Sequence, residues 1–151
     1  LSRASGMGGM AGGQALDLQA ETDQPDEAGI IRLQAMKTGA LLRFACEAGP
    51  IIAGAPIEDR QRLAEFGSAI GLAFQLSDAL LDHTSDAMTL GKATGKDNAA
   101  GKATLVSLHG SVWAGKQLMG LVDQAVELLA PYGEKAGVLI EAARFVAARR
   151  K

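Results

Sequence analysis

Two carboxylates lie four residues apart in the apolar segment FQLSDALLD, residues 74–82. At about 100° per helical residue, Asp78 and Asp82 share a helix face with Gln75, and Asp86 joins them if the helix extends that far. Like charges one turn apart repel, so this arrangement costs stability unless solvent or a cation relieves it. Oxygen ligands favour a hard cation such as Mg²⁺ or Mn²⁺. Two carboxylates do not fill a magnesium shell, which leaves room for water and phosphate oxygens.

The alternative for this pair is an ordinary solvated helix face, and the spacing by itself favours that interpretation. The neighbouring residues favour the cation site instead, because they leave little polar surface around the carboxylates. We therefore expect the two Asp side chains to face a cavity. The apolar neighbours are Phe74, Leu76, Ala79, Leu80 and Leu81.

A second candidate site lies in KTGALL, residues 37–42, where Lys37 and Thr38 interrupt an apolar segment with helical periodicity. A buried ammonium group is costly unless an anion lies beside it. A lysine next to a hydroxyl group suits a phosphate, because one supplies a point charge and the other a hydrogen-bond donor. The alternative, that Lys37 extends along the helix to reach solvent, stays open.

A glycine- and lysine-rich segment, residues 91–103, follows the carboxylates and contains Lys92, Lys96 and Lys102. It differs from a phosphate-binding P-loop: GKDNAAGKA has one residue too many between its glycines, Ala103 replaces Ser or Thr, and no strand pattern precedes it. The loop could still close over an anion, with a lysine as point charge. Lys96 and Lys102 are predicted to be solvated.

The composition predicts one all-α domain. A chain of 151 residues is about the size of a single domain, and hydrophobic residues make up 48% of it but aromatic residues only 4%, which favours helices over strands. Helices are expected over residues 27–48, 56–83, 105–130 and 134–148. The glycines within residues 6–18 weaken a helix there, but their helical spacing would suit close approach to a neighbour.

Charge and cysteine content exclude some function classes. Fifteen basic residues against seventeen acidic ones give no basic excess for binding nucleic acid. The longest apolar stretch without charge, residues 66–77, is too short to span a bilayer. The single cysteine, Cys46, cannot form an internal disulfide, which fits a reducing cytoplasm. Its apolar surroundings suggest packing and not nucleophilic catalysis.

Four segments, GMAGGQALDL, KTGALL, FQLSDALLD and LGKATGKDNAAGKATL, occur in this order. With them, nearly the whole chain resembles the C-terminal part of the trans-isoprenyl diphosphate synthases of the farnesyl and geranylgeranyl diphosphate synthase type. The resemblance implies a bundle of long helices around a central cavity, with residues 1–151 as the C-terminal portion of a single isoprenoid synthase domain. It also implies a homodimer. The chain begins at Leu1 inside a glycine-rich segment, so we expect it to be part of a longer protein.

In that family an allylic diphosphate is ionised with the help of Mg²⁺, and isopentenyl diphosphate attacks the resulting carbocation. Magnesium and lysine side chains neutralise the departing diphosphate, while an apolar cavity keeps water from the carbocation. By resemblance, Lys37 and Asp78 are the catalytic candidates. Asp78 would ligate Mg²⁺, and Asp82 would support the ion directly or through water. The residues implied to contact the allylic diphosphate are Lys37, Thr38, Gln75, Lys92 and, by a weaker match, Gln14.

The chain departs from the family pattern in two ways. The second aspartate-rich motif, DDxxD, reads DALLD here, so Ala79 replaces an Asp and removes support for the metal ligands. The first motif, DDxxxxD followed by paired arginines, does not occur in these residues, and neither do the residues that hold isopentenyl diphosphate. We therefore expect these 151 residues alone to be unable to catalyse the condensation.

Three other functions compete with the prenyl synthase interpretation. A catalytically inactive paralogue, truncated remnant or partner subunit would explain Ala79 and the missing first motif. An isoprenoid cyclase would use the same ionisation, but the KTG and GK segments are more like those of chain-elongating synthases. A helical interaction module without ligands would show no change in melting temperature when magnesium or a diphosphate analogue is added.

Overall fold

The computed structural model describes residues 1–90 and 104–149, including all their side chains except those of 85–90. Within those two ranges every regular element is helical, as the composition predicts. The elements in chain order are α1 (Ser2–Ser5), α2 (Met10–Asp23), α3 (Glu27–Gln34), the π-helical segment η1 (Ala35–Gly39), α4 (Ala40–Ile52), α5 (Ile57–Leu90), α6 (Leu105–His109), α7 (Ser111–Leu128), the 3₁₀ segment η2 (Ala130–Ala136) and α8 (Gly137–Ala148).

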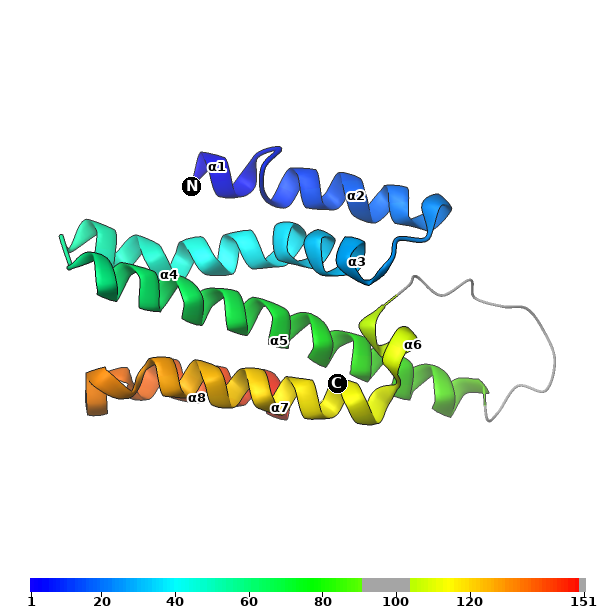
Figure 1. The fold of residues 1–151 in the computed structure, drawn as a ribbon. Helices are drawn as coiled ribbons and strands as arrows, with labels where there is room; N and C mark the ends of the chain where they lie inside the picture. The colour runs from blue at the N-terminus through cyan, green and yellow to red at the C-terminus, as the bar shows by residue number, and fades with distance from the viewer. Residues whose placement is uncertain (91–103, 150–151) are drawn as a thin grey trace.

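The helices are stacked in layers around α5, the longest helix (Figure 1). On one side α5 packs against α4 and η1, and α2 covers η1 from outside. On its other side α5 packs against α7 and, to a smaller extent, α8. The long continuous segment α3–η1–α4 and the middle of α5 therefore run next to each other, so residues nearly 40 positions apart in the sequence come into contact.

The hydrophobic core lies between α5 and α7. Buried side chains recur at helical spacing on both helices, which places one apolar face of each against the other. Full burial of one such leucine contributes about 2 kcal/mol. The core residues of α5 include Phe66, Ile70, Ala73 and Leu76, and those of α7 include Leu118, Val122 and Ala125.

Close packing of α2 against η1 depends on Gly13. A Cβ atom at this position would lie 2.6 Å from the Cα of Lys37, which is closer than Cβ atoms approach other atoms in real structures. The prediction that glycine spacing serves close approach is thus confirmed at Gly13. Although the glycines lower the helix propensity of this segment, α2 extends from Met10 to Asp23, and its contact with η1 stabilises it.

Several helix boundaries differ from those predicted. The helix expected to end near residue 48 continues through Pro50 to Ile52, and α5 continues beyond 83 to Leu90. A single helix was expected over 105–130, but Gly110 separates α6 from α7. Gly110 has a φ of 86°, a left-handed conformation that glycine adopts without steric cost.

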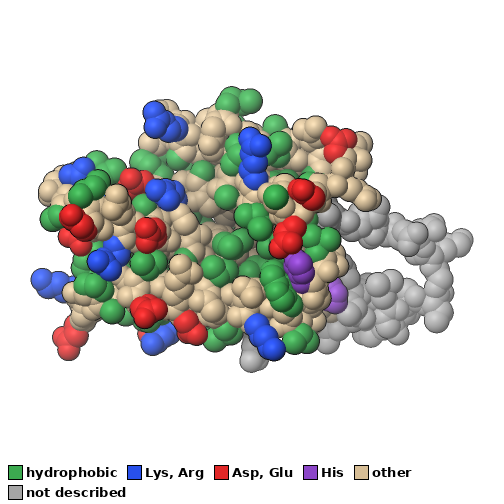
Figure 2. Space-filling model, viewed as in Figure 1, with side chains coloured by type: hydrophobic (Ala, Val, Ile, Leu, Met, Phe, Trp, Pro, Cys, Tyr) green, Lys and Arg blue, Asp and Glu red, His purple; other side chains and the backbone are tan. Residues whose placement is uncertain are grey.

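Charged side chains are scattered over the face shown in Figure 2, where Lys and Arg alternate with acidic and apolar groups. That face offers no gathered basic patch of the kind nucleic acids require. In the part of the chain that the structure describes, no helix combines the length and hydropathy needed to cross a membrane.

Candidate active site

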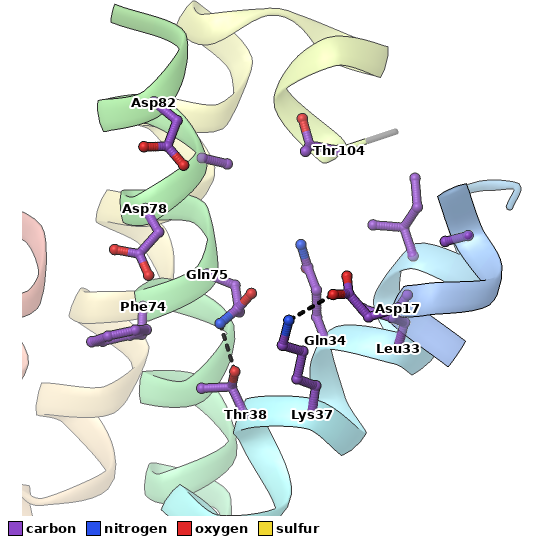
Figure 3. A pocket seen from close by; sticks show the side chains of 13 residues that line it. Asp17, Leu33, Gln34, Lys37, Thr38, Phe74, Gln75, Asp78, Asp82 and Thr104 are labelled. Atoms are coloured by element: carbon purple, nitrogen blue, oxygen red, sulfur yellow. Dashed lines mark hydrogen bonds and ion pairs between the residues drawn. The ribbon is translucent and has the colours of Figure 1, made fainter. Parts of the chain in front are cut away.

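A cavity of about 420 Å³ opens between α2, the α3–η1 segment, α5 and the start of α6 (Figure 3). Its lining combines apolar side chains with a larger number of polar and charged ones. The lining residues are Asp17 and Ala20 of α2; Ile30, Leu33 and Gln34 of α3; Lys37 and Thr38 of η1; Phe74, Gln75, Asp78, Ala79 and Asp82 of α5; and Thr104. The sequence predicted such a cavity in front of Asp78 and Asp82, and both residues line it.

Lys37 is held by a carboxylate that the sequence analysis did not single out. Its Nζ atom lies 2.7 Å from Oδ2 of Asp17, whose side chain is only 12% exposed. An anion beside the lysine was expected, and the protein itself supplies one. Asp17 lies four residues after Gly13, so the glycine that brings α2 against η1 also brings this carboxylate to Lys37. The sequence signal for this contact is the four-residue spacing of Gly13 and Asp17 in the segment GGQALDL.

Thr38 and Gln75 join the two walls of the cavity. The amide Nε2 of Gln75 donates a hydrogen bond of 2.7 Å to Oγ1 of Thr38 (Figure 3). Because the Thr38 oxygen accepts this bond, its own O–H can donate to a third group. Thr38 belongs to the π-helical segment, and Gln75 contacts it from α5. π-Helical turns often occur at functional sites.

Asp78 forms an ion pair with Arg149, which follows the end of α8. The Arg149 guanidinium carbon also lies 4.1 Å from the centroid of the Phe74 ring, a cation–π contact. The side chain of Asp78 remains 46% exposed, so one of its faces is open to solvent. Arg149 therefore contacts both a carboxylate and an aromatic ring of α5.

The carboxylates suit a magnesium ion that is shared with a ligand. Among residues 1–90 and 104–149 there is no group of three or more His, Cys, Asp or Glu side chains that could hold a metal by themselves. Asp78 and Asp82 line one cavity from successive turns of α5, and Mg²⁺ commonly binds one or two carboxylates together with water and substrate phosphates. The donor set therefore fits Mg²⁺ in the presence of a phosphate ligand.

One predicted ligand contact does not line this cavity, and another falls outside the described residues. Gln14 is exposed and does not line it. Gly13 takes the face of α2 that packs on η1, and Gln14, about 100° further round the helix, points outward. Lys92 lies outside the described residues, as do the other lysines of its loop.

Cys46 has no features of a nucleophile. It is partly buried against the hydrophobic core, and burial raises the pKa of its thiol. The thiol therefore stays protonated at neutral pH, in agreement with the packing role that the sequence predicts.

Comparison with known proteins identifies relatives over nearly the whole chain. The family model described as polyprenyl synthetase matches residues 3–138. A dimethylallyltranstransferase from Fischerella ambigua is 41% identical over 150 residues, and farnesyl diphosphate synthase of Escherichia coli is 40% identical over 141 residues. These alignments cover 99% and 90% of this chain but 43% and 46% of the relatives.

Solved structures give the same result. The crystal structure of a FPP/GFPP synthase from Zymomonas mobilis superposes with a TM-score of 0.83 at 42% identity, over 96% of this chain and 48% of that one. The chain thus spans about half the length of the relatives it matches. The family model matches residues 3–138, which is most of the chain, and the chain belongs to the polyprenyl synthetase family.

Proposed function

We propose that the protein to which these residues belong is a short-chain prenyltransferase that condenses an allylic diphosphate with isopentenyl diphosphate. The observation that carries the proposal is the convergence of Lys37, Thr38, Gln75 and Asp78 on one cavity. The names of the relatives, a dimethylallyltranstransferase and a farnesyl diphosphate synthase, support the same reaction class.

In this reaction the bond between the allylic carbon and the diphosphate oxygen breaks, and its electron pair leaves with the diphosphate. The Lys37 ammonium would stabilise the growing negative charge, and the Thr38 hydroxyl would donate to a phosphate oxygen. The double bond of isopentenyl diphosphate then attacks the carbocation, and loss of a proton restores an alkene. Lys37 has three N–H donors, so it can keep its contact with Asp17 while it binds the diphosphate.

Asp78 and Asp82 would hold Mg²⁺, which adds positive charge beside the leaving group. For Asp78 to do so, the Arg149 guanidinium must move away from the carboxylate oxygen that it contacts. The apolar side chains of Ile30 and Leu33 on α3 and of Phe74 on α5 would exclude water, which would otherwise capture the carbocation.

The proposal includes a homodimer located in the cytoplasm. Large apolar side chains on α8 are exposed in this chain, among them Val138 at 83% and Phe145 at 66%. Exposed apolar groups of this size favour a protein–protein contact.

A catalytically inactive member of the family is the second candidate. Ala79 lines the cavity between the two carboxylates, at a position where the family motif has Asp. An inactive protein would bind magnesium and diphosphate but would not extend the allylic substrate to a longer prenyl product.

The test has two arms. Binding of geranyl diphosphate in the presence of Mg²⁺ is measured by isothermal titration calorimetry for the wild-type chain, Lys37→Ala and the control Lys116→Ala, which removes an exposed lysine of α7. Loss of one charged hydrogen bond predicts at least about tenfold weaker binding for Lys37→Ala alone. Incorporation of radiolabelled isopentenyl diphosphate into product is then measured with the complete protein. Incorporation indicates an enzyme, and its absence indicates an inactive relative. Equal binding by all three proteins would contradict the proposal.

A further inference from the structure

Asp17 places a negative charge directly beside the cation that should attract a phosphate. Its carboxylate Oδ2 lies 2.7 Å from Nζ of Lys37, and the Asp17 side chain is only 12% exposed. Figure 3 shows this pair on the side of the cavity opposite Asp78. A cavity that simply bound anions would be better served by Lys37 without this carboxylate, because the ammonium would then attract the anion with its full charge.

Acidic groups outnumber basic ones in the described part of the cavity. Three carboxylates, those of Asp17, Asp78 and Asp82, line it together with one ammonium group, that of Lys37. The Arg149 guanidinium contacts Asp78 and adds a second cation, so the carboxylates remain in excess among the described residues. A free diphosphate carries several negative charges at neutral pH, and these groups taken together therefore repel it.

Coulomb's law shows how far Asp17 weakens the attraction that Lys37 exerts. A phosphate oxygen on the far side of the ammonium would lie roughly 3 Å from Nζ and roughly 5–6 Å from the carboxylate, so about half of the attraction is cancelled. A partly exposed pair of this kind stabilises a fold only weakly. The effect of Asp17 on a bound anion is therefore expected to exceed its contribution to stability.

A diphosphate that carries a magnesium ion meets a different balance of charge. The ion cancels two of the negative charges of the diphosphate, and Asp78 and Asp82 would attract the ion. Among the described residues, Asp17 does not form a group with these two carboxylates that could hold a metal. Its charge therefore weakens the binding of the free anion more than that of the magnesium complex, because the free anion is more negative.

We infer that Asp17 is a specificity-determining residue of the cavity, which favours a magnesium-bound diphosphate over the free anion by cancelling part of the charge of Lys37. The inference rests on the proposed function, because it takes the ligand to be a diphosphate. Pyrophosphate, the second product of the condensation, would then bind only weakly once its metal has dissociated.

The experiment measures the affinity of pyrophosphate by calorimetry, once with Mg²⁺ and once with EDTA. It compares the wild-type chain with Asp17→Asn and with the control Asp23→Asn, which removes the same charge from an exposed position at the end of α2. Asparagine has the shape of aspartate and still offers Lys37 an oxygen acceptor, so the charge is the main change at position 17. Asp17→Ser, which removes the same charge, takes its place if the asparagine variant does not fold.

With EDTA we expect Asp17→Asn to bind pyrophosphate at least about tenfold more tightly than the wild type, and Asp23→Asn to differ from it less than about twofold. With Mg²⁺ the affinity of Asp17→Asn should change less than about threefold, because the complex is less negative. The preference for the magnesium complex, expressed as the ratio of the two affinities, should thus fall in Asp17→Asn only.

Three results would overturn the inference. The wild type could bind pyrophosphate equally well with EDTA and with Mg²⁺, the affinity with EDTA could stay unchanged in Asp17→Asn, or it could rise equally in Asp23→Asn. If Lys37→Ala weakens the binding of magnesium pyrophosphate while Asp17→Asn keeps the metal preference of the wild type, the proposed function stands and only this inference fails. If the wild-type chain binds no magnesium pyrophosphate, both fail.

Discussion

Arg149 and Asp78 form an ion pair that joins the end of α8 to the metal-binding candidate of α5, and the same guanidinium lies 4.1 Å from the centre of the Phe74 ring. The carboxylate that should bind Mg²⁺ is therefore in contact with a cation that belongs to the chain. A metal ion and this guanidinium compete for one oxygen. The competition has measurable consequences.

Removal of Arg149 should strengthen metal binding. With Arg149→Gln, Asp78 no longer spends part of its time paired, and the apparent affinity rises by the reciprocal of the fraction that was available. For a partly exposed ion pair with a cation–π contact we expect about three- to tenfold tighter binding of Mn²⁺, a substitute for Mg²⁺ that is measured by electron paramagnetic resonance.

The control for this change is Arg144→Gln, which removes the same charge from an exposed position of α8 where Arg144 contacts Glu141. It should change Mn²⁺ binding less than twofold. In the Asp78→Asn background, which lacks the competing carboxylate, Arg149→Gln should not change Mn²⁺ binding any further. If Arg144→Gln and Arg149→Gln strengthen binding equally, a general charge effect explains the result and direct competition is excluded.

Substitution of Gly13 by alanine should destabilise the chain strongly. The new Cβ would lie 2.6 Å from the Cα of Lys37, so α2 must move away from η1 and carry Asp17 with it. We expect a loss of about 2–4 kcal/mol in the free energy of unfolding, measured with urea, or failure to fold. The matched control is Gly120→Ala in α7, where a Cβ meets no atom within 4 Å and where alanine should stabilise the helix by about 0.5–1 kcal/mol. Equal effects of the two substitutions would contradict the packing described for α2.

The Lys37–Asp17 pair should show a measurable coupling energy. Single substitutions Asp17→Asn and Lys37→Met and the double variant form a double-mutant cycle for the free energy of unfolding. Because Lys37 keeps about a third of its surface exposed, we expect a coupling of only about 1 kcal/mol, reduced further by salt. A coupling near zero at low salt would show that the two groups do not stabilise each other.

Alkaline pH should weaken the contact between η2 and α5. Burial, and then the hydrogen bond from the Tyr132 hydroxyl to Asp59, 2.7 Å long, raise the pKa of this tyrosine above its ordinary value of 10. The folded chain then holds the phenol proton more tightly than the unfolded chain. The stabilisation is complete below pH 10 and is lost as the pH rises through the pKa of the folded state.

Tyr132→Phe removes this titration and should flatten the fall in stability above pH 10. Urea unfolding at pH 8 and at pH 10.5 measures the difference between the wild type and the variant. An equal fall in both proteins would mean that Tyr132 is not responsible.

Much of the site could be predicted from sequence because its residues recur at helical spacing. Asp78, Asp82 and Gln75 share a face by periodicity alone, and the cavity in front of them is confirmed. The helical fold follows from composition, from few aromatic residues and from proline and glycine positions. Boundaries were less accurate, because the extension of α4 past Pro50 depends on packing that periodicity does not contain.

What the sequence could not predict depends on contacts between distant segments. Asp17 belongs to the site only because Gly13 lets α2 approach η1, and Arg149 reaches Asp78 from 71 residues further along the chain. The π-helical segment that orients Lys37 and Thr38 has no composition signal, since AMKTG would suit an ordinary helix. The resemblance implies Gln14, but Gly13 takes the face of α2 that packs on η1, so Gln14 does not line the cavity.

The proposed function requires that Asp78 and Lys37 bind one magnesium–diphosphate complex. The decisive measurement is calorimetric titration of magnesium pyrophosphate into the wild-type chain, Asp78→Ala and Asp123→Ala, the last removing an exposed carboxylate of α7. We predict that Asp78→Ala weakens binding at least about tenfold, since a metal ligand is lost, while Asp123→Ala binds as the wild type does. Wild-type affinity in Asp78→Ala would contradict the account.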